Sequence, residues 1–397
     1  MDARLIPEVN IGTMGHVDHG KTTLVKALTG KWTAQHSEEM KRGITIKIGY
    51  ADATIFLCKK CGVYTVKERC MRCFERAEPV RTVSFVDAPG HETLMATVLS
   101  AAKLMDGVLF TIAANEKCPQ AQTKEHLNVL NIIGIKNIIV VQTKIDVVTK
   151  ERALESYNEI KRFLKGSIAE NAPVIPVSAE HSININELLN AIQECIPTPK
   201  REKEKPPRMF VVRSFDINKP GADPRQLSGG ILGGSIIQGN ISVGDEIEIA
   251  PVKIGNKVQV IKTKVVGLQK AGKDVEQAGP GGLVGLLTML DPSLTKSDSM
   301  AGTYAGKELP EMRTKALVEI TLFSQTVTGE KIERPIVNET LMLNIGPQRI
   351  LGKIISSKKQ RFEIEFSMPV ICEKDERIVI SRKIGDRWRL IGYGMVL

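Results

Sequence analysis

Four cysteines stand in the pattern C-x2-C-x8-C-x2-C, at Cys58, Cys61, Cys70 and Cys73. Two such pairs supply four thiolates, which is the ligand set that suits a tetrahedral zinc ion. Gly62, which directly follows the second cysteine, permits the tight turn that zinc knuckles use. Because four thiolates leave no open coordination position, the pattern predicts a structural Zn²⁺ rather than a catalytic one.

Two other chemistries of paired cysteines stay open. A redox C-x-x-C motif needs only one pair, normally at a helix start, and neither pair here precedes a helical pattern. An iron–sulfur cluster also takes four cysteines, although nothing else in the chain indicates electron transfer. The other three of the seven cysteines, Cys118, Cys195 and Cys372, are scattered, which is not typical of a disulfide framework.

A phosphate-binding pattern precedes the cysteines. "GHVDHGKT", residues 15–22, matches G-x-x-x-x-G-K-[ST] and joins an apolar strand pattern to a helical one, the context that this motif requires. Backbone N–H groups of such a loop and of the helix start face phosphate oxygens. We expect Lys21 to reach the terminal phosphates and the Thr22 hydroxyl to bind Mg²⁺. The residues expected to contact the nucleotide are Asp18, His19, Gly20, Lys21, Thr22 and Thr23.

Two further segments, "RGIT" and "DAPGH", are candidates for sensing a γ-phosphate. Asp87 ends an apolar strand pattern and can hold Mg²⁺ through water, and Gly90 offers an N–H to the γ-phosphate. The Thr45 hydroxyl is a candidate second Mg²⁺ ligand, in a segment whose order would depend on that phosphate. The cysteine cluster lies between these segments in the sequence, which favours a partner-facing or switch-bracing role for it.

Hydrolysis of a nucleotide needs a positioned water. His91 follows the phosphate-sensing glycine and is the candidate for that task, with Lys21 stabilising charge on the phosphates. Val17 and Ile44 are apolar residues that would gate His91 until a partner acts. For His16 and His19, both within the phosphate loop, we favour structural roles.

"TKID" and "SAE" are candidates for reading the base. The Asp146 carboxylate can accept hydrogen bonds from N1–H and N2–H of guanine, which adenine does not offer. The Lys144 stem can cover the base, and the "SAE" backbone can donate to guanine O6. The prediction is therefore GTP and GDP, not ATP. G proteins usually have Asn where this chain has Thr143, and that Asn ties the loop to the phosphate loop. The residues of "SAE" are Ser178, Ala179 and Glu180.

The elements that position these loops are read from periodicity. "VSFVDAPG", "GVLFTIAAN", "NIIVVQTKID" and "VIPVSAE" are buried strands alternating with helices, one of which buries Ile185, Leu188, Leu189 and Ile192. This predicts an α/β P-loop domain with a parallel or mixed sheet, helices on both faces and a zinc-knuckle insert. Beyond the charged, proline-rich residues 196–209, short strands with Gly turns predict two all-β barrels. The expected domains are 1–203, with the knuckle at 58–73, then 207–308 and 312–397.

Composition sets the class of protein and its partners. The chain has 397 residues, a net charge of +10 and a pI near 9.1, which fits either a polyanionic partner or a basic solvated surface. Aromatic residues are 4%, so base stacking on aromatic platforms is not the favoured mode of nucleic-acid binding. No apolar run approaches the roughly 20 residues that span a bilayer, and no signal segment opens the chain, so we expect a cytoplasmic protein without a membrane partner.

"GHVDHGKTT", "RGITI" and "DAPGH" resemble the elongation factor Tu family of translational GTPases, which carry aminoacyl-tRNA. "RGITIKIGYADA", the four-cysteine insert and "RSFDINKPG" are more specifically similar to the gamma subunits of archaeal and eukaryotic translation initiation factor two, in the archaeal form. The resemblance covers essentially the whole chain. It implies a GTPase that delivers methionylated initiator tRNA to the small ribosomal subunit, with alpha and beta subunits as partners. It also implies a second Mg²⁺ site at Asp18 and the Gly43 backbone, which adds Asp18 to the candidate catalytic residues.

Three other functions compete with this interpretation. A selenocysteine-specific elongation factor belongs to the same class of carriers but has an additional C-terminal domain. The G-protein subunit that regulates a sulfate-activating adenylyltransferase shares the three-domain layout but not the zinc insert. A GTP-binding scaffold without relevant turnover is the third, and hydrolysis assays with small ribosomal subunits would separate it.

Overall fold

The computed structural model describes residues 3–33, 48–90 and 95–219, the single positions 221, 223 and 225, and residues 227–397. The chain divides into an N-terminal unit, Met1–Lys200, and a C-terminal unit, Arg201–Leu397. Each unit is described by itself below. Among the described helices, none has the length and apolar character needed to cross a membrane.

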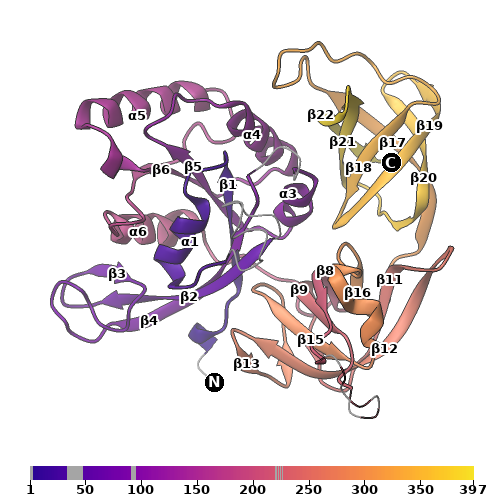
Figure 1. The fold of residues 1–397 in the computed structure, drawn as a ribbon, viewed down its shortest axis with the longest axis horizontal. Helices are drawn as coiled ribbons and strands as arrows, with labels where there is room; N and C mark the ends of the chain where they lie inside the picture. The colour runs from indigo at the N-terminus through magenta and orange to yellow at the C-terminus, as the bar shows by residue number, and fades with distance from the viewer. Residues whose placement is uncertain are drawn as a thin grey trace. The chain divides into compact units, whose positions relative to one another are not determined.

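A seven-stranded mixed sheet forms the centre of the N-terminal unit (Figure 1). Its order is β3-β2-β4-β1-β5-β6-β7. The strands β4, β1, β5, β6 and β7 run parallel, and β2 and β3 form an antiparallel edge beside β4. The strands are β1 (Val9–Gly15), β2 (Gly49–Cys58), β3 (Val63–Thr65), β4 (Glu78–Asp87), β5 (Gly107–Ala113), β6 (Ile138–Thr143) and β7 (Val174–Pro176).

Helices cover both faces of this sheet, as the alternating pattern predicted. All seven residues of β5 are buried, because one face packs on α1 and α6 while α3, α4 and α5 lie on the other side (Figure 1). The four residues predicted to share the core face of α6 are all buried there. The helices are α1 (Lys21–Thr29), α3 (Met95–Ala102), α4 (Ala121–Ile133), α5 (Lys150–Leu164) and α6 (Ile185–Cys195), with the 3-10 turns η1 (Ala3–Leu5) and η3 (Ile145–Val147).

The parallel strands bring the predicted loops to one edge of the sheet. β1, β4, β5 and β6 all run the same way, so Gly15, Asp87, Ala113 and Thr143 end at that edge. In open sheets of this kind, ligands bind outside the carboxyl ends of the strands. Residues far apart in the sequence are thereby placed around one potential site.

The cysteine cluster lies at the other end of the sheet. β2 and β4 pair antiparallel over their length, with Gly49 opposite Asp87 and Leu57 opposite Glu78. β4 has ten residues, and ten residues span about 30 Å at roughly 3.3 Å per residue. The knuckle is therefore remote from Asp87, although it lies between the phosphate-sensing segments in the sequence. Direct bracing of Asp87 by the knuckle is therefore not supported, while the segment at residues 42–45 lies outside the described residues.

The first barrel of the C-terminal unit is a closed ring of six strands, β11-β16-β8-β9-β15-β12, that is completed by pairing of β11 with β12. Alternate residues of these strands fill its core, including Met209, Leu232 and Ile249. The ring strands are β8 (Arg208–Phe215), β9 (Ile231–Gln238), β11 (Glu246–Ile254), β12 (Lys257–Lys270), β15 (Val284–Thr288) and β16 (Tyr304–Gly306). Shorter pieces are β10 (Ile241–Ser242), β13 (Lys273–Asp274), β14 (Gln277–Ala278) and the 3-10 turn η5 (Pro292–Asp298).

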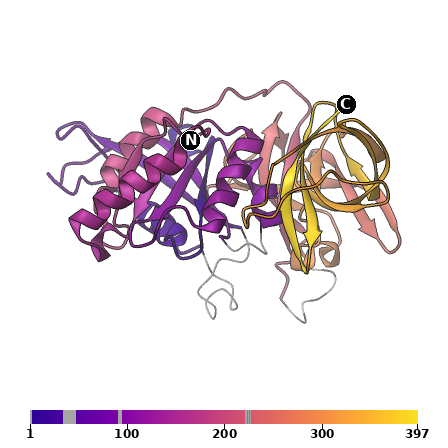
Figure 2. The ribbon, with the colours of Figure 1, turned by 90° about the horizontal axis from the view of Figure 1, so that it is seen from above.

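The second barrel is also closed, in the order β17-β20-β19-β18-β21-β22, and its strands curl into a ring in Figure 2. Burial alternates along β19, and Ile350 and Ile354 on its buried face belong to a shared apolar core. Its strands are β17 (Met312–Leu322), β18 (Thr340–Ile345), β19 (Gln348–Lys358), β20 (Arg361–Ile371), β21 (Arg377–Ile384) and β22 (Arg387–Val396). The two barrels predicted from the sequence are thus present.

Candidate nucleotide site and cysteine cluster

The phosphate loop joins β1 to α1 and holds a buried ammonium group. Lys21 Nζ donates hydrogen bonds to the carbonyl oxygens of Gly15, at 2.9 Å, and His16, at 2.6 Å. Burial lowers the pKa of Lys21 to about 8, and the carboxylates of Asp87 and Asp18 partly oppose that change. Within the described residues, the hydrogen bonds of this buried ammonium go to carbonyl oxygens, which favours an additional anion beside it, and phosphate fits that need.

Asp87 is fully buried at the end of β4 and is surrounded by hydroxyl groups. Its Oδ1 accepts a hydrogen bond from Thr13 at 2.9 Å, and its Oδ2 accepts from Thr22 at 2.8 Å and Thr33 at 2.7 Å. Burial raises the pKa of Asp87, while the three hydroxyls and Lys21 oppose the rise. Thr22 and Asp87, which were predicted to share Mg²⁺, are thus in direct contact, and an oxygen-only set of this kind suits that ion.

Gly90 approaches the phosphate loop so closely that no side chain fits. A Cβ at this position would lie 2.4 Å from Lys21 Nζ, 2.9 Å from the Gly15 carbonyl oxygen and 3.0 Å from the Val17 nitrogen. Glycine therefore lets the "DAPG" backbone reach the point where Lys21 meets the loop. The geometry matches a backbone N–H that approaches a bound terminal phosphate.

The base-reading loops meet one another and the phosphate loop. The Ser178 hydroxyl lies near the Asp146 carboxylate and is the leading cause of a lowered pKa for Asp146. The Thr143 hydroxyl donates to the carbonyl oxygen of His19 at 2.8 Å, and both groups are buried. A threonine at this position therefore ties the base loop to the phosphate loop, as the longer asparagine does in other G proteins. Lys144 begins the following turn with a left-handed backbone, φ 57°.

His19 is a structural residue of the loop, as expected. Its Nδ1 lies 3.1 Å from the Thr111 carbonyl oxygen and its Nε2 lies 3.4 Å from Glu116 Oε2. Burial lowers its pKa to about 4, so the ring is neutral near pH 7. Thr111 belongs to β5 and Glu116 to the loop after it, so His19 joins the phosphate loop to the central strand.

Helix α4 contributes two residues that the sequence did not single out. Gln122 Oε1 accepts a hydrogen bond from the Val17 nitrogen at 3.4 Å. His126 is fully buried, and its ring faces the Gly90 backbone without completing a hydrogen bond of ordinary geometry. Burial lowers the pKa of His126 to about 3. The run "QTKEH" places both side chains on one helical face, four residues apart, which is the signal that could have found them.

Of the remaining predicted nucleotide residues, some lie in the described part of the chain and others outside it. Asp18 is exposed in a left-handed turn, φ 61°, while Gly20 and Thr23 are half-buried at the start of α1. Ala179 and Glu180 follow Ser178 at the same edge of the sheet. The predicted residues that lie outside the described part of the chain are Gly43, Ile44, Thr45 and His91.

The four cysteines of the knuckle converge, and their sulfur atoms lie within 4.8 Å of one another. Cys58 and Cys73 are 3.5 Å apart at sulfur, against about 3.8 Å for two thiolates on a tetrahedral zinc. Backbone N–H groups of Cys73 and Arg72 lower the pKa of Cys70 to about 6, whereas hydrogen bonding with Cys73 raises that of Cys61 to about 12, so the fit to zinc rests on the convergence of the sulfur atoms. The residues present therefore fit a zinc ion.

The two turns of the knuckle are built alike. The nitrogen of Gly62 donates to the Cys58 carbonyl oxygen at 2.8 Å, and the nitrogen of Phe74 donates to that of Cys70 at 2.8 Å. Both residues have positive φ, 66° at Gly62 and 59° at Phe74. The sequence predicted the role of the glycine, but a phenylalanine at the matching position was not expected.

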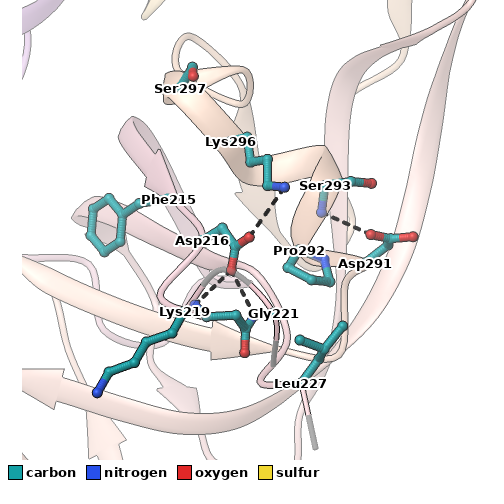
Figure 3. Close-up of a pocket in the computed structure, with 11 residues that line it drawn as sticks. Phe215, Asp216, Lys219, Gly221, Leu227, Asp291, Pro292, Ser293, Lys296 and Ser297 are labelled. Carbon is teal, nitrogen blue, oxygen red and sulfur yellow. Dashed lines mark hydrogen bonds and ion pairs between the residues drawn. The ribbon is translucent and has the colours of Figure 1, made fainter. Parts of the chain in front are cut away.

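A pocket of about 600 Å³ lies on the first barrel, beside η5 (Figure 3). Its two carboxylates are already engaged by residues of the same surface. Asp216 accepts hydrogen bonds from the Asn218 nitrogen at 2.8 Å and the Asn218 amide at 2.7 Å, and pairs with Lys296 at 3.7 Å. Asp291 accepts from the Ser293 nitrogen at 2.8 Å. Because these carboxylates are already used, the pocket does not point to a ligand.

Comparisons with known proteins place these features in context. The elongation factor Tu GTP binding domain matches residues 7–198, and the C-terminal domain of initiation factor eIF2 gamma matches residues 312–396. The chain is 54% identical over 399 residues to translation initiation factor 2 subunit gamma of Pyrococcus furiosus, covering 98% of this chain and 97% of that protein. It is also 54% identical to the protein of that name in Methanocaldococcus jannaschii, over 98% of this chain and 97% of the relative.

Solved structures of elongation factors share the fold. A bacterial selenocysteine-specific elongation factor, EF-Sec, is 25% identical with a TM-score of 0.77, and the match covers 98% of this chain and 58% of that one. Translation elongation factor SelB from Methanococcus maripaludis, in complex with the GTP analogue GPPNHP, is 24% identical with a TM-score of 0.74, covering 98% of this chain and 79% of that one. The chain therefore spans only 58% of the length of the bacterial structure.

Proposed function

This chain belongs to the translation initiation factor 2 subunit gamma family, and on that premise we propose that its GTP form carries methionylated initiator tRNA to the small ribosomal subunit. The chain is a GTPase initiation factor. Hydrolysis of GTP to GDP and phosphate, after start-codon recognition, would release the tRNA. Alpha and beta subunits would complete a cytoplasmic heterotrimer. The observation that carries the proposal is the 54% identity over 98% of the chain, together with a nucleotide site assembled at one sheet edge.

The phosphates and Mg²⁺ would bind where Lys21, Asp87 and Gly90 converge. Backbone N–H groups of residues 18–23 would surround the phosphates, and the Lys21 ammonium would turn from the loop carbonyls to phosphate oxygens. A Mg²⁺ ion held there would supply positive charge against the charge that develops on the phosphates during hydrolysis. Thr22 and Asp87 would hold it with Thr45. Asp18 and the Gly43 backbone are the proposed holders of a second Mg²⁺.

Guanine would be read by Asp146, next to Ser178. The carboxylate accepts from both N–H groups on that side of guanine, while the Ser178 hydroxyl orients it. A low pKa keeps Asp146 ionised, which its role as a double acceptor needs. Lys144 would cover the base. In an Asp146→Asn variant, one acceptor becomes a donor, so recognition should move from guanine to xanthine, which has oxygen at position 2.

Hydrolysis would depend on His91 positioning the attacking water. Val17 and Ile44 would keep the His91 side chain away from that water until the ribosome acts. The test is the GTPase rate of His91→Ala with small ribosomal subunits and initiator tRNA. A loss of at least about 100-fold is expected for a positioned catalytic group. A wild-type rate in the variant would remove His91 from the mechanism.

The knuckle is proposed to be a structural zinc site. Its small core contains only three buried residues with four partly buried ones against it, so a metal is needed to hold the two turns together. The domain limits 1–203, 207–308 and 312–397 remain the proposed division of the chain.

The alternative of a selenocysteine-type carrier is not favoured. The structures of that class are 24–25% identical, whereas the initiation factor subunits are 54% identical over nearly the whole chain. A regulator of a sulfate-activating adenylyltransferase lacks similar support, since the C-terminal barrel matches the eIF2 gamma domain over residues 312–396.

The deciding experiment is a binding assay with charged tRNAs and no ribosomes. The chain, with and without the alpha subunit, is titrated with methionylated initiator tRNA in GDP and in a non-hydrolysable GTP analogue. Methionylated elongator tRNA is the matched control. We expect at least about tenfold tighter binding of the initiator in the GTP form, or ~1.4 kcal/mol. Equal affinity for the two tRNAs, or for the two nucleotide states, would contradict the proposal.

A further inference from the structure

The second turn of the knuckle, residues 69–76, exposes arginine and apolar side chains together. Arg69, Arg72 and Arg76 are all exposed, and within the described residues no ion pair or hydrogen bond engages their guanidinium groups. Between them, Met71 and Phe74 are 61% and 69% exposed. We call residues 69–76 the knuckle tip. It forms part of the loop between β3 and β4 in Figure 1.

Two of these arginines lie where their positive charges repel each other. Arg69 and Arg76 are partners in an antiparallel bridge, where like charges directly opposite each other destabilise the fold. By contrast, the lysines of the first turn are satisfied: Lys59 pairs with Glu78 at 2.7 Å and Lys60 with Glu75 at 3.1 Å. An anion bound between the arginines would relieve their repulsion.

Phe74 is also costly to the free protein. It occupies the left-handed position that Gly62 occupies in the first turn, with φ 59° against 66°. A bulky residue is strained in that conformation and a glycine is not. The side chain gains little burial in return, since it is 69% exposed. The turn closed by the Phe74 nitrogen and the Cys70 carbonyl oxygen sets this backbone, but it does not require an exposed phenylalanine there, and a contact outside this chain would give the ring a use.

Arginine with an exposed aromatic ring fits RNA better than an acidic protein surface. A guanidinium group binds phosphate through two parallel hydrogen bonds and also stacks on bases. Aromatic rings stack on bases that are not already paired, as in loops and bulges of structured RNA. An acidic protein surface would use the charges but would leave Phe74 without a specific partner.

The position of the knuckle tip indicates which RNA would bind there. It lies about 30 Å from Asp87, at the far end of β2 and β4. A contact there is remote from Asp87, at the end of β4 that faces the phosphate loop, so it suits a partner held in both nucleotide states. The tRNA cargo is bound in only one of them under the function proposed above. The ribosomal subunit is the platform on which both states act.

We infer that the knuckle tip docks on an unpaired segment of small-subunit ribosomal RNA, with the three arginines on phosphates and Phe74 stacked on a base. The inference rests on the proposed function for the choice of the small subunit.

The experiment measures affinity of the full, zinc-loaded chain for isolated small subunits as a function of salt concentration, with GDP and with a GTP analogue. The variant Arg69→Ala, Arg72→Ala, Arg76→Ala is compared with a control that removes three exposed charges elsewhere in the same unit: Lys136→Ala, Lys161→Ala, Lys165→Ala. Loss of three phosphate contacts should reduce the slope of log affinity against log salt by about 2. The control should reduce it by less than about 0.5.

Phe74→Gly separates recognition from folding. Glycine favours the left-handed backbone, so the variant should be at least as stable as the wild type and retain one zinc. Its subunit affinity should fall at least about fivefold, the lower end for a lost base stack. Phe74→Tyr keeps the ring and should restore binding. Equal binding by Phe74→Gly and wild type would overturn the stacking contact.

Other partners predict different results. If the triple arginine variant lost affinity for initiator tRNA without subunits, tRNA would be the partner and the inference would be wrong. If the triple arginine variant bound intact small subunits more weakly than wild type but bound protein-free small-subunit RNA equally well, the partner would be a protein. That result would also overturn the inference. The tRNA assay uses no ribosomes, so failure of the proposed function and failure of this inference remain distinguishable.

Discussion

Thr143→Val tests whether one hydroxyl couples the base loop to the phosphate loop. Valine keeps the shape of threonine but cannot donate to the His19 carbonyl oxygen, which lies 2.8 Å from the Thr143 hydroxyl in a buried contact. An unsatisfied buried carbonyl costs about 1–3 kcal/mol. Without nucleotide the two loops can relax and avoid this cost. With nucleotide bound, both loops are held and the cost appears in affinity.

The expected loss of GDP affinity in Thr143→Val is therefore about 5-fold to 150-fold, which corresponds to ~1–3 kcal/mol. The free energy of unfolding without nucleotide should fall by less than ~1 kcal/mol. Thr143→Ser is the matched control, because it retains the hydroxyl and loses a methyl group. It should bind GDP within about threefold of wild type and lose ~0.8 kcal/mol of stability. Thr143→Asn should stay within about tenfold, or ~1.4 kcal/mol.

The assay is a titration with fluorescent GDP, combined with urea unfolding of the nucleotide-free protein. The two variants should therefore separate, with Val affecting affinity and Ser affecting stability. GDP affinity within twofold of wild type for Thr143→Val would refute the coupling. A larger affinity loss in Thr143→Ser than in Thr143→Val would refute it as well, since the methyl group would then matter more than the hydroxyl.

Three further predictions concern other parts of the molecule. The pKa of His126 is lowered from 6.5 to about 3 in the folded protein. As the pH drops from 6.5 toward 3, His126 is protonated in the unfolded chain but not in the folded one, so the free energy of unfolding falls. Between pH 7 and 4.5 this amounts to about 2–3 kcal/mol, and urea unfolding of His126→Leu should show a pH dependence smaller by that amount; an unchanged dependence would contradict the assignment. Removal of zinc by a chelator should expose residues 58–76 to protease while GDP affinity stays within about twofold, because the knuckle is ~30 Å from Asp87; a parallel loss of GDP affinity would restore a switch-bracing role. Asp146→Asn should weaken GDP binding at least about 100-fold, because one charge-assisted hydrogen bond is replaced by two opposed donors and the other loses its charge. It should bind xanthosine diphosphate more tightly than GDP; retained guanine preference would contradict the assignment of Asp146.

Much of the candidate site could be predicted from short patterns of neighbouring residues. A glycine-rich loop between a strand and a helix is defined by adjacent residues, so residues 15–22 could be assigned from their own spacing. The same holds for the four cysteines and for the core face of α6. Parallel strands then bring their ends to one edge, which allowed Asp87 and Thr143 to be placed near the loop before any contact was known.

Contacts between distant residues were not accessible in this way. Thr143 and His19 are 124 positions apart, and nothing local shows that the shorter hydroxyl reaches the carbonyl. Thr33 joins Asp87, and His126 faces Gly90, because helices and loops pack on the sheet in three dimensions. Side-chain burial and pairing depend on that packing, which periodicity does not encode.

The sequence by itself determined the candidate chemistry: a phosphate-loop pattern, a carboxylate suited to guanine, four cysteines with the spacing of zinc ligands, and the class of GTPase that combines them. These follow from residue types at short spacings, where chain geometry leaves little freedom. Only the tertiary structure decided the distances between them. The knuckle is a neighbour of the phosphate-sensing segments along the chain, yet two antiparallel ten-residue strands carry it to the opposite end of the sheet.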